Sequence, residues 1–199
     1  MKRNASSAID VLRRLPSPLF TSADTAKLVS YENVFLHRAS RKGYVKKIAN
    51  RIYWNVLFST NPPTVEQVAC FARRPSYVSC EWALNHHGIL LQAPTVCTAI
   101  TLHSGIGKRN RIFYQDYVIE YSRIAEKLYL PEEILNLDNV LMATPEKALL
   151  DCAYLRKRVP FADELETDLL DKSRLSSVVA VYPARVWKRI EGWLKEDRH

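Results

Sequence analysis

Residues 21–54 read TSADTAKLVSYENVFLHRASRKGYVKKIANRIYW. This stretch predicts two helices followed by a β-hairpin. Thr21 is a residue type that caps helix N-termini, and the apolar residues after it fall on one face of a short helix. A second helix is expected to begin near Tyr31 and to end before Gly43, because glycine readily takes the positive φ that follows a helix. Short helices followed by a hairpin are typical of a winged helix-turn-helix, so we expect this fold at the N-terminal end.

The hairpin is expected from two β-prone runs, Tyr44–Ile48 and Arg51–Trp54, with Asn50 tolerating the turn geometry between them. If Phe35, Leu36 and Ala39 face inward, the opposite face of the second helix is polar and basic, as in a helix that enters the major groove of DNA. The residues predicted to contact DNA are Asn33, His37, Arg38, Arg41, Lys42, Lys46, Lys47, Asn50 and Arg51.

The net charge of the chain is concentrated in this region. Residues 1–58 hold eleven Lys or Arg and three Asp or Glu, a difference of +8. The remaining residues hold eighteen of each sign, so the whole excess of the chain, also +8, lies in the N-terminal region. A localised positive charge of this size favours binding to a polyanion, since neutralised phosphates release counterions.

The length of the chain fits one large domain or two smaller ones, and its composition is that of a globular protein. Asn61-Pro62-Pro63 interrupts regular structure, so we expect a DNA-binding domain at residues 1–60 and a second domain at residues 61–199. No signal segment or membrane-length apolar run is visible, which favours a cytoplasmic protein without membrane contact. The four cysteines are widely spaced without a Cys-x-x-Cys, which argues against a zinc site and a disulfide scaffold.

The second domain is predicted to be α+β with a small antiparallel sheet. Ser79 and Gly88 are expected to cap a short helix, and the runs 96–101, 111–114 and 117–121 are expected to form successive antiparallel strands. Gly105–Arg109 lacks the glycine and the Ser or Thr of a Walker A loop and is interpreted as a basic hairpin tip. Helices are also expected at residues 163–171 and 183–195.

Neither a catalytic centre nor a cofactor or metal site is predicted. Adjacent His86 and His87 diverge by about 100° on a helix and cannot both face one ion. Thr144-Pro145-Glu146 is a well-formed helix start, and Lys147 is placed to pair with Asp151 one turn later. Glu146 and Asp151 are about 140° apart, so capping and surface pairing are favoured over acid-base catalysis.

The stretches YVSCEWALNHHGIL, residues 77–90, and MATPEKALLD, residues 142–151, following a basic winged helix, resemble the AbiEi-like antitoxins of type IV toxin-antitoxin and abortive-infection systems. The resemblance covers most of the chain. It implies a transcriptional autorepressor that binds inverted repeats in its own promoter and opposes a nucleotidyltransferase-like toxin without necessarily touching it. Cooperative self-association on DNA is a further expectation, because the near-zero charge of residues 59–199 favours protein contacts over a second DNA site.

Three alternatives stay open. The second domain could be a nuclease delivered by the winged helix, although no lysine has an acid two residues before it, as a restriction-type centre needs. The chain could be a transcription regulator unrelated to toxins. The basic domain could instead bind RNA or an acidic protein, although winged helices offer few aromatics for stacking single strands.

Overall fold

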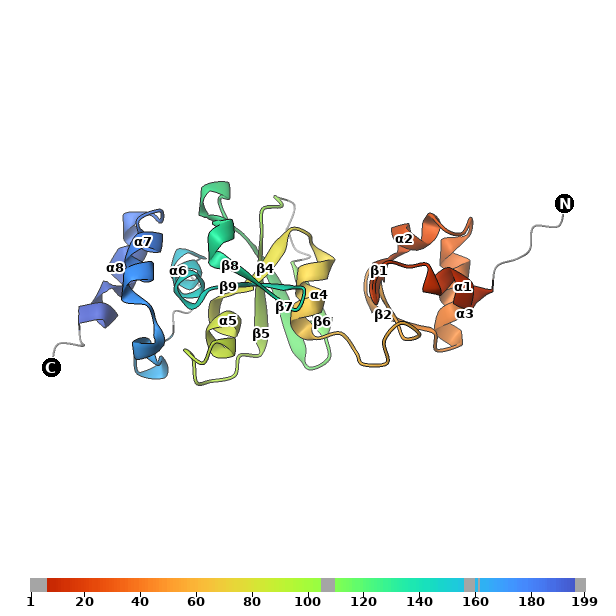
Figure 1. Ribbon diagram of the computed structural model, residues 1–199, viewed down its shortest axis with the longest axis horizontal. Helices are drawn as coiled ribbons and strands as arrows, with labels where there is room; N and C mark the ends of the chain where they lie inside the picture. The colour runs from red at the N-terminus through yellow and green to blue at the C-terminus, as the bar shows by residue number, and fades with distance from the viewer. Residues whose placement is uncertain (1–6, 105–109, 156–159, 161, 196–199) are drawn as a thin grey trace. The chain divides into compact units, whose positions relative to one another are not determined.

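The computed structural model describes residues 7–104, 110–155, 160 and 162–195 (Figure 1). It is an α+β protein that divides into two compact units, Met1–Thr64 and Val65–His199. The division falls directly after the Asn61-Pro62-Pro63 stretch. Among the described residues, no helix has the length and apolar character needed to cross a membrane.

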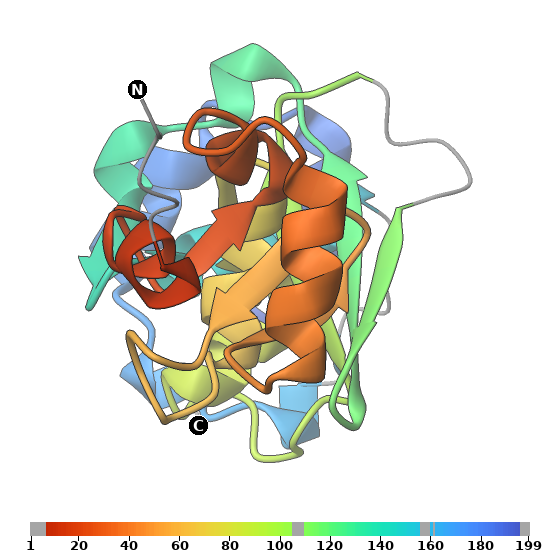
Figure 2. The same ribbon diagram turned by 90° about the vertical axis from the view of Figure 1, so that its right-hand side faces the viewer.

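The first unit combines short helices with a three-stranded antiparallel sheet of order β1-β3-β2. Figure 2 shows α3 beside the β2–β3 hairpin, which it contacts through β2. In chain order the elements are α1 (Ala8–Arg13), β1 (Leu19–Thr21), α2 (Ser22–Ala26), α3 (Glu32–Arg41), β2 (Val45–Ala49) and β3 (Ile52–Asn55). The two helices and the hairpin predicted across residues 21–54 are therefore confirmed.

Local hydrogen bonds fix the ends of these helices. The Thr21 hydroxyl accepts from the Asp24 backbone N–H, while the Asp24 carboxylate accepts from the Thr21 N–H, a capping box that begins α2. At the end of α3, Gly43 takes a φ of +73°. The N–H groups of Gly43 and Tyr44 then donate to the carbonyls of Ser40 and Ala39, the pattern of a Schellman motif.

A small apolar cluster holds the first unit together. It is made of buried residues from α1, the turn after it, β1, α3 and β2, namely Leu12, Leu15, Phe20, Leu36, Ala39 and Val45. The buried Asn55 adds a polar tie, because its side-chain amide donates to the Leu12 carbonyl over 2.9 Å. The inward face of α3 packs against this cluster through Leu36 and Ala39, so the opposite face is the one that a ligand can reach.

The second unit is built in layers around a six-stranded sheet of order β6-β7-β5-β4-β9-β8. In Figure 1, α4 covers one face of this sheet, α5 and α6 cover the other, and α7 and α8 lie outside α6. The elements are α4 (Val65–Ala72), β4 (Ser76–Ser79), α5 (Cys80–His86), β5 (Val96–Thr101), β6 (Arg111–Tyr114), β7 (Tyr117–Arg123), β8 (Ile134–Leu137), β9 (Val140–Ala143), α6 (Pro145–Leu155), α7 (Lys172–Val179) and α8 (Ala184–Lys195).

The prediction of a small antiparallel sheet in this unit is only partly right. The strands at 111–114 and 117–121 do pair antiparallel, as β6 and β7. The sheet is mixed, because β5 pairs with β7 and β4 pairs with β9 in parallel. The strands 96–101 and 111–114 were expected to be neighbours, but β7 lies between them. The nine residues between β5 and β6 are more than a tight hairpin needs, which leaves room for this arrangement. Gly105–Arg109 lies outside the described residues.

The helix predicted at residues 163–171 is also wrong. Short 3₁₀ turns at Ala162–Glu164 and Thr167–Leu169 take its place. Leu165 between them bridges to Leu90 and is buried. The helix begins only after Asp171, whose carboxylate accepts from the N–H groups of Ser173 and Arg174 as an N-cap.

A buried ion pair lies on α6, the helix between α5 and the outer helices. Lys147 and Asp151 pair as the i,i+4 spacing predicts, with 3.3 Å between Nζ and Oδ1. Both side chains are 0% exposed, so the expectation of a surface pair is wrong. The physical reason is that α6 is covered by neighbours all round, and residues 146–153 are all buried.

Hydrogen bonds satisfy this pair from several elements. Asp151 accepts from the hydroxyls of Tyr77 and Ser79 on β4, at 3.0 and 2.8 Å, and from that of Tyr182 at 2.6 Å. Lys147 donates to the Leu128 carbonyl over 2.7 Å. The cluster therefore ties α6 to the sheet, to the loop after β7 and to the segment between α7 and α8.

Desolvation governs the ionisation of these groups. Burial raises the pKa of Asp151, against the opposing effects of Lys147 and three hydroxyl donors. Burial lowers the pKa of Lys147, against the opposing effect of Asp151. Burial also raises the pKa of Tyr77 and Tyr182 well above the ordinary value, so both phenols remain protonated donors to the carboxylate.

We predict that Lys147→Met lowers the free energy of unfolding by about 3–5 kcal/mol, because it leaves the Asp151 carboxylate buried without its counter-ion. Urea unfolding monitored by circular dichroism measures the change. Lys27→Met is the matched control, because Lys27 forms an exposed pair with Asp24 and its loss should cost less than about 1 kcal/mol. Equal, small effects for the two variants would show that the buried pair contributes little.

Candidate nucleic-acid interface

The outward face of α3 carries the side chains predicted to read DNA. Asn33, His37, Arg38 and Arg41 are all exposed, while Leu36 and Ala39 on the opposite face are buried. The orientation expected from helical periodicity is therefore confirmed. Bidentate arginines and an asparagine are side chains that recognise base edges in the major groove.

Two further features of α3 bear on recognition. Val34 lies on the same outward face and is 48% exposed, which places an apolar group where a thymine methyl can be contacted. The Asn33 amide donates to the Glu32 carboxylate over 3.3 Å. If Asn33 contacts a base, this hydrogen bond to Glu32 has to be replaced by one to the base. The free-energy cost of that exchange is small, because the hydrogen bond is exposed to solvent.

The β2–β3 hairpin supplies the rest of the predicted set. Lys46, Lys47, Asn50 and Arg51 are exposed, and the Lys46 ammonium lies 5.2 Å from the ring centroid of Trp54. The left-handed turn residue is Arg51, with a φ of 61°, and not Asn50 as expected. The register shifts between Lys47 and Ala49, so an extra residue moves the turn by one position.

All nine predicted residues, including Lys42 at the end of α3, are exposed and lie on two adjoining elements. Two of the three acids of the unit do not neutralise them, because they serve as helix caps. Asp10 accepts from the Ser7 N–H, and Asp24 accepts from the Thr21 N–H. Burial opposes ionisation of Asp24, but bonds from Thr21 and the nearby Lys27 hold the pKa of its carboxyl below the ordinary value.

In the second unit, the polar residues considered as catalytic candidates make structural contacts. Glu146 is buried and accepts from the Asp171 backbone N–H over 2.9 Å. His87 is half-buried, and its Nε2 lies 2.9 Å from the Ala143 carbonyl. Burial lowers the pKa of His87.

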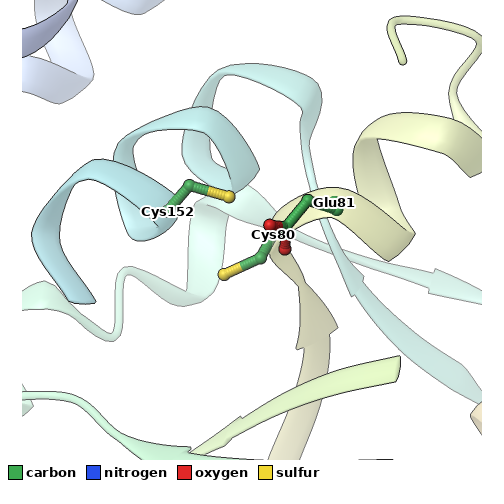
Figure 3. Close-up of side chains that lie close together, drawn as sticks. All are labelled: Cys80, Glu81 and Cys152. Carbon is green, nitrogen blue, oxygen red and sulfur yellow. The ribbon is translucent and has the colours of Figure 1, made fainter. Parts of the chain in front are cut away.

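The structure also brings together three residues that sequence spacing does not connect. Cys80 and Glu81 lie at the start of α5, and Cys152 lies on α6 (Figure 3). Their sulfur and carboxylate oxygen atoms all lie within 4.8 Å of one another. The sequence gives no signal of this group, because Cys80 and Cys152 are 72 positions apart and only the packing of α5 on α6 joins them.

Comparison with known proteins gives evidence of fold and no more. The chain matches no protein-family model and no curated protein. It is similar in structure to the RV2827C protein from Mycobacterium tuberculosis, a crystal structure, with a TM-score of 0.61 and 14% sequence identity. The similarity covers 94% of this chain and 74% of that chain. At this identity it shows a shared fold for most of the present chain.

We predict that Arg41 and the hairpin lysines have separable effects on binding to duplex DNA. Arg41→Ala should relax sequence preference at a cost of about 1–3 kcal/mol, because a bidentate base contact is lost. Lys46→Ala or Lys47→Ala should weaken specific and random DNA alike and reduce the salt dependence, because phosphate contacts carry no sequence information. Gel shifts over a salt series measure both effects.

The control for this experiment is Lys127→Ala, an exposed lysine of the second unit that should leave binding unchanged. Equal loss on specific and random DNA for Arg41→Ala would contradict the assignment of α3 as the reading helix.

Proposed function

We propose that the first unit is a winged helix-turn-helix that binds double-stranded DNA. The observation that carries the proposal is the exposed basic face of α3 beside the exposed basic hairpin. In this proposal α2 and α3 form the helix-turn-helix, α3 enters the major groove, and the β2–β3 hairpin is the wing that contacts phosphates. The order of helices and strands in the unit supports this assignment, as does the concentration of the net charge of +8 within residues 1–58.

The proposed role of this binding is transcriptional autorepression. A single unit presents only one reading helix, so specific repression favours two copies on paired inverted repeats. Residues 59–199 have no net charge with which to bind a second DNA segment. The second unit is therefore proposed to strengthen DNA binding through contacts between two copies of the protein. Cooperative self-association on DNA is thus part of the proposal.

We further propose that the protein is the antitoxin of a type IV toxin-antitoxin system and opposes a nucleotidyltransferase-like toxin in phage abortive infection. This step rests on the resemblance of residues 77–90 and 142–151 to AbiEi-like antitoxins. In the structure these stretches lie side by side. The two stretches pack against each other, with the Ser79 hydroxyl donating to Asp151 over 2.8 Å, so the residues that carry the resemblance form one connected centre.

The division of labour between the units predicts different behaviour for the fragment and the full chain. Residues 1–64 alone should bind one repeat weakly, because the reading face is complete within the first unit. The full chain should bind paired repeats cooperatively. Its binding curve on paired repeats should be steeper than that of the fragment, and its affinity for paired repeats should exceed its affinity for a single repeat. Fluorescence anisotropy with single-repeat and paired-repeat duplexes measures this difference. Identical curves for fragment and full chain on paired repeats would contradict the cooperative role.

The antitoxin role is tested in cells. If a nucleotidyltransferase-like reading frame lies next to the gene, it is expressed from an unrelated promoter, alone and with this protein, and survivors are counted. Full-length protein should restore survival, and an Arg41→Ala, Lys46→Ala, Lys47→Ala variant should still do so, because the unrelated promoter removes repression from the experiment. Failure of the full-length chain to rescue would leave a DNA-binding regulator unrelated to toxins.

A further inference from the structure

Cys80, Glu81 and Cys152 form a compact group of donor atoms in the second unit. Two thiols and one carboxylate lie within 4.8 Å of one another at the junction of β4, α5 and α6. In Figure 3 the Cys152 side chain extends from α6 toward the first turn of α5, where Cys80 and Glu81 lie. Both cysteines are 0% exposed and neither forms a disulfide.

The distances suit a small ion. Zinc binds thiolate sulfur at about 2.3 Å and carboxylate oxygen at about 2.0–2.2 Å, so two sulfurs on one tetrahedral ion are about 3.8 Å apart. Atoms that already lie within 4.8 Å of one another need to move by only about 1 Å to reach that arrangement. Rotation of side chains supplies such a movement without displacement of α5 or α6.

Glu81 also borders a cleft at the surface of the second unit. Glu81 is half-buried and lines a cleft of about 540 Å³, which also includes Thr98, Arg111 and Glu120 on the sheet and Glu164 opposite. Both thiols are buried in the core, so Glu81 is the member of the group that also lines this cleft.

Burial opposes the charged form of the ligands. Without an ion, burial raises the pKa of Cys152 well above the ordinary value, so its thiol is protonated. Binding an ion would release this proton, as in other thiolate sites.

The backbone at Cys80 is an independent feature of the same place. Its φ is +57°, in the left-handed region that residues other than glycine occupy at a cost. Directly after β4, this conformation directs the Cys80 side chain into the core beside α6 and begins α5 in the same step.

We propose that Cys80, Glu81 and Cys152 bind a thiophilic divalent ion of the zinc class. Two thiolates select a soft or borderline metal over magnesium or calcium, and three protein ligands leave a position for water. The site is independent of DNA binding by the first unit, so either proposal stands if the other fails. An alternative role for the two thiols is simple apolar packing, which predicts no metal affinity.

Cobalt(II) is the probe, because thiolate-bound cobalt gives an ultraviolet charge-transfer band and tetrahedral cobalt gives intense visible bands. Full-length reduced protein titrated with cobalt should develop both features at one equivalent, and zinc should displace them. Cys80→Ser and Cys152→Ser should each weaken binding by at least about 100-fold, since losing even an outer partner of a metal ligand costs about 10–100-fold.

Cys97→Ser is the matched control, because Cys97 is an equally buried free cysteine outside the group and its loss should leave the spectrum unchanged. Glu81→Gln tests the third ligand without disturbing the buried core and should keep the charge-transfer band while weakening affinity. Absence of a charge-transfer band in the wild-type protein would overturn the proposal, whatever the folding of the variants. A band that persists unchanged in both Cys80→Ser and Cys152→Ser would overturn it as well.

Discussion

The second unit depends on the buried contact between Lys147 and Asp151. A carboxylate or an ammonium alone in this position is strongly unfavourable, because neither can be solvated in the core. The pair is tolerated because β4, the loop after β7 and the segment before α8 each contribute a partner, namely Tyr77 and Ser79, the Leu128 carbonyl, and Tyr182. These hydrogen bonds form together only when the sheet, α6 and the segment before α8 are packed as observed, so removing one partner of the pair leaves the other charge buried and uncompensated.

The first unit is held together by local hydrogen bonds and a small apolar core, without a buried ion pair among its described residues. Its core is a short apolar cluster, and its helices are defined by local caps such as the Thr21–Asp24 box and the Gly43 Schellman motif. Two of its three acids are used in those caps, and the basic residues of α3 and the hairpin remain on the surface. Fixing structure with short-range hydrogen bonds leaves a whole face of the unit available for a polyanion, and this is the physical basis for the proposed DNA contact.

Local signals explain which parts of the structure were predictable. The ends of α2, α3 and α5 follow from Thr21, Gly43 and Gly88, because capping and positive φ are properties of a few neighbouring residues. The exposed basic set follows from helical periodicity. The parallel pairs of the sheet do not, since they join segments far apart in the chain, and Ser76–Ser79 is buried throughout and lacks the alternation that marks a strand. The depth of Lys147 and the meeting of Cys80 with Cys152 were missed for the same reason, because both depend on how helices pack.

The stretches that carry the resemblance to AbiEi-like antitoxins occupy the structural centre of the second unit. The buried Asp151 carboxylate requires hydrogen-bond donors, and the Ser79 hydroxyl is one of them. A protein that shares both stretches is therefore expected to share the packing of β4, α5 and α6, whatever ligand its surfaces bind. The proposed repression depends on residues 33–51 of the other unit, where a few exposed side chains can change without affecting the fold. The fold of the second unit and the DNA sequence that the first unit would bind can therefore change independently. Substitutions in residues 77–90 and 142–151 test the fold, and substitutions in residues 33–51 test DNA binding.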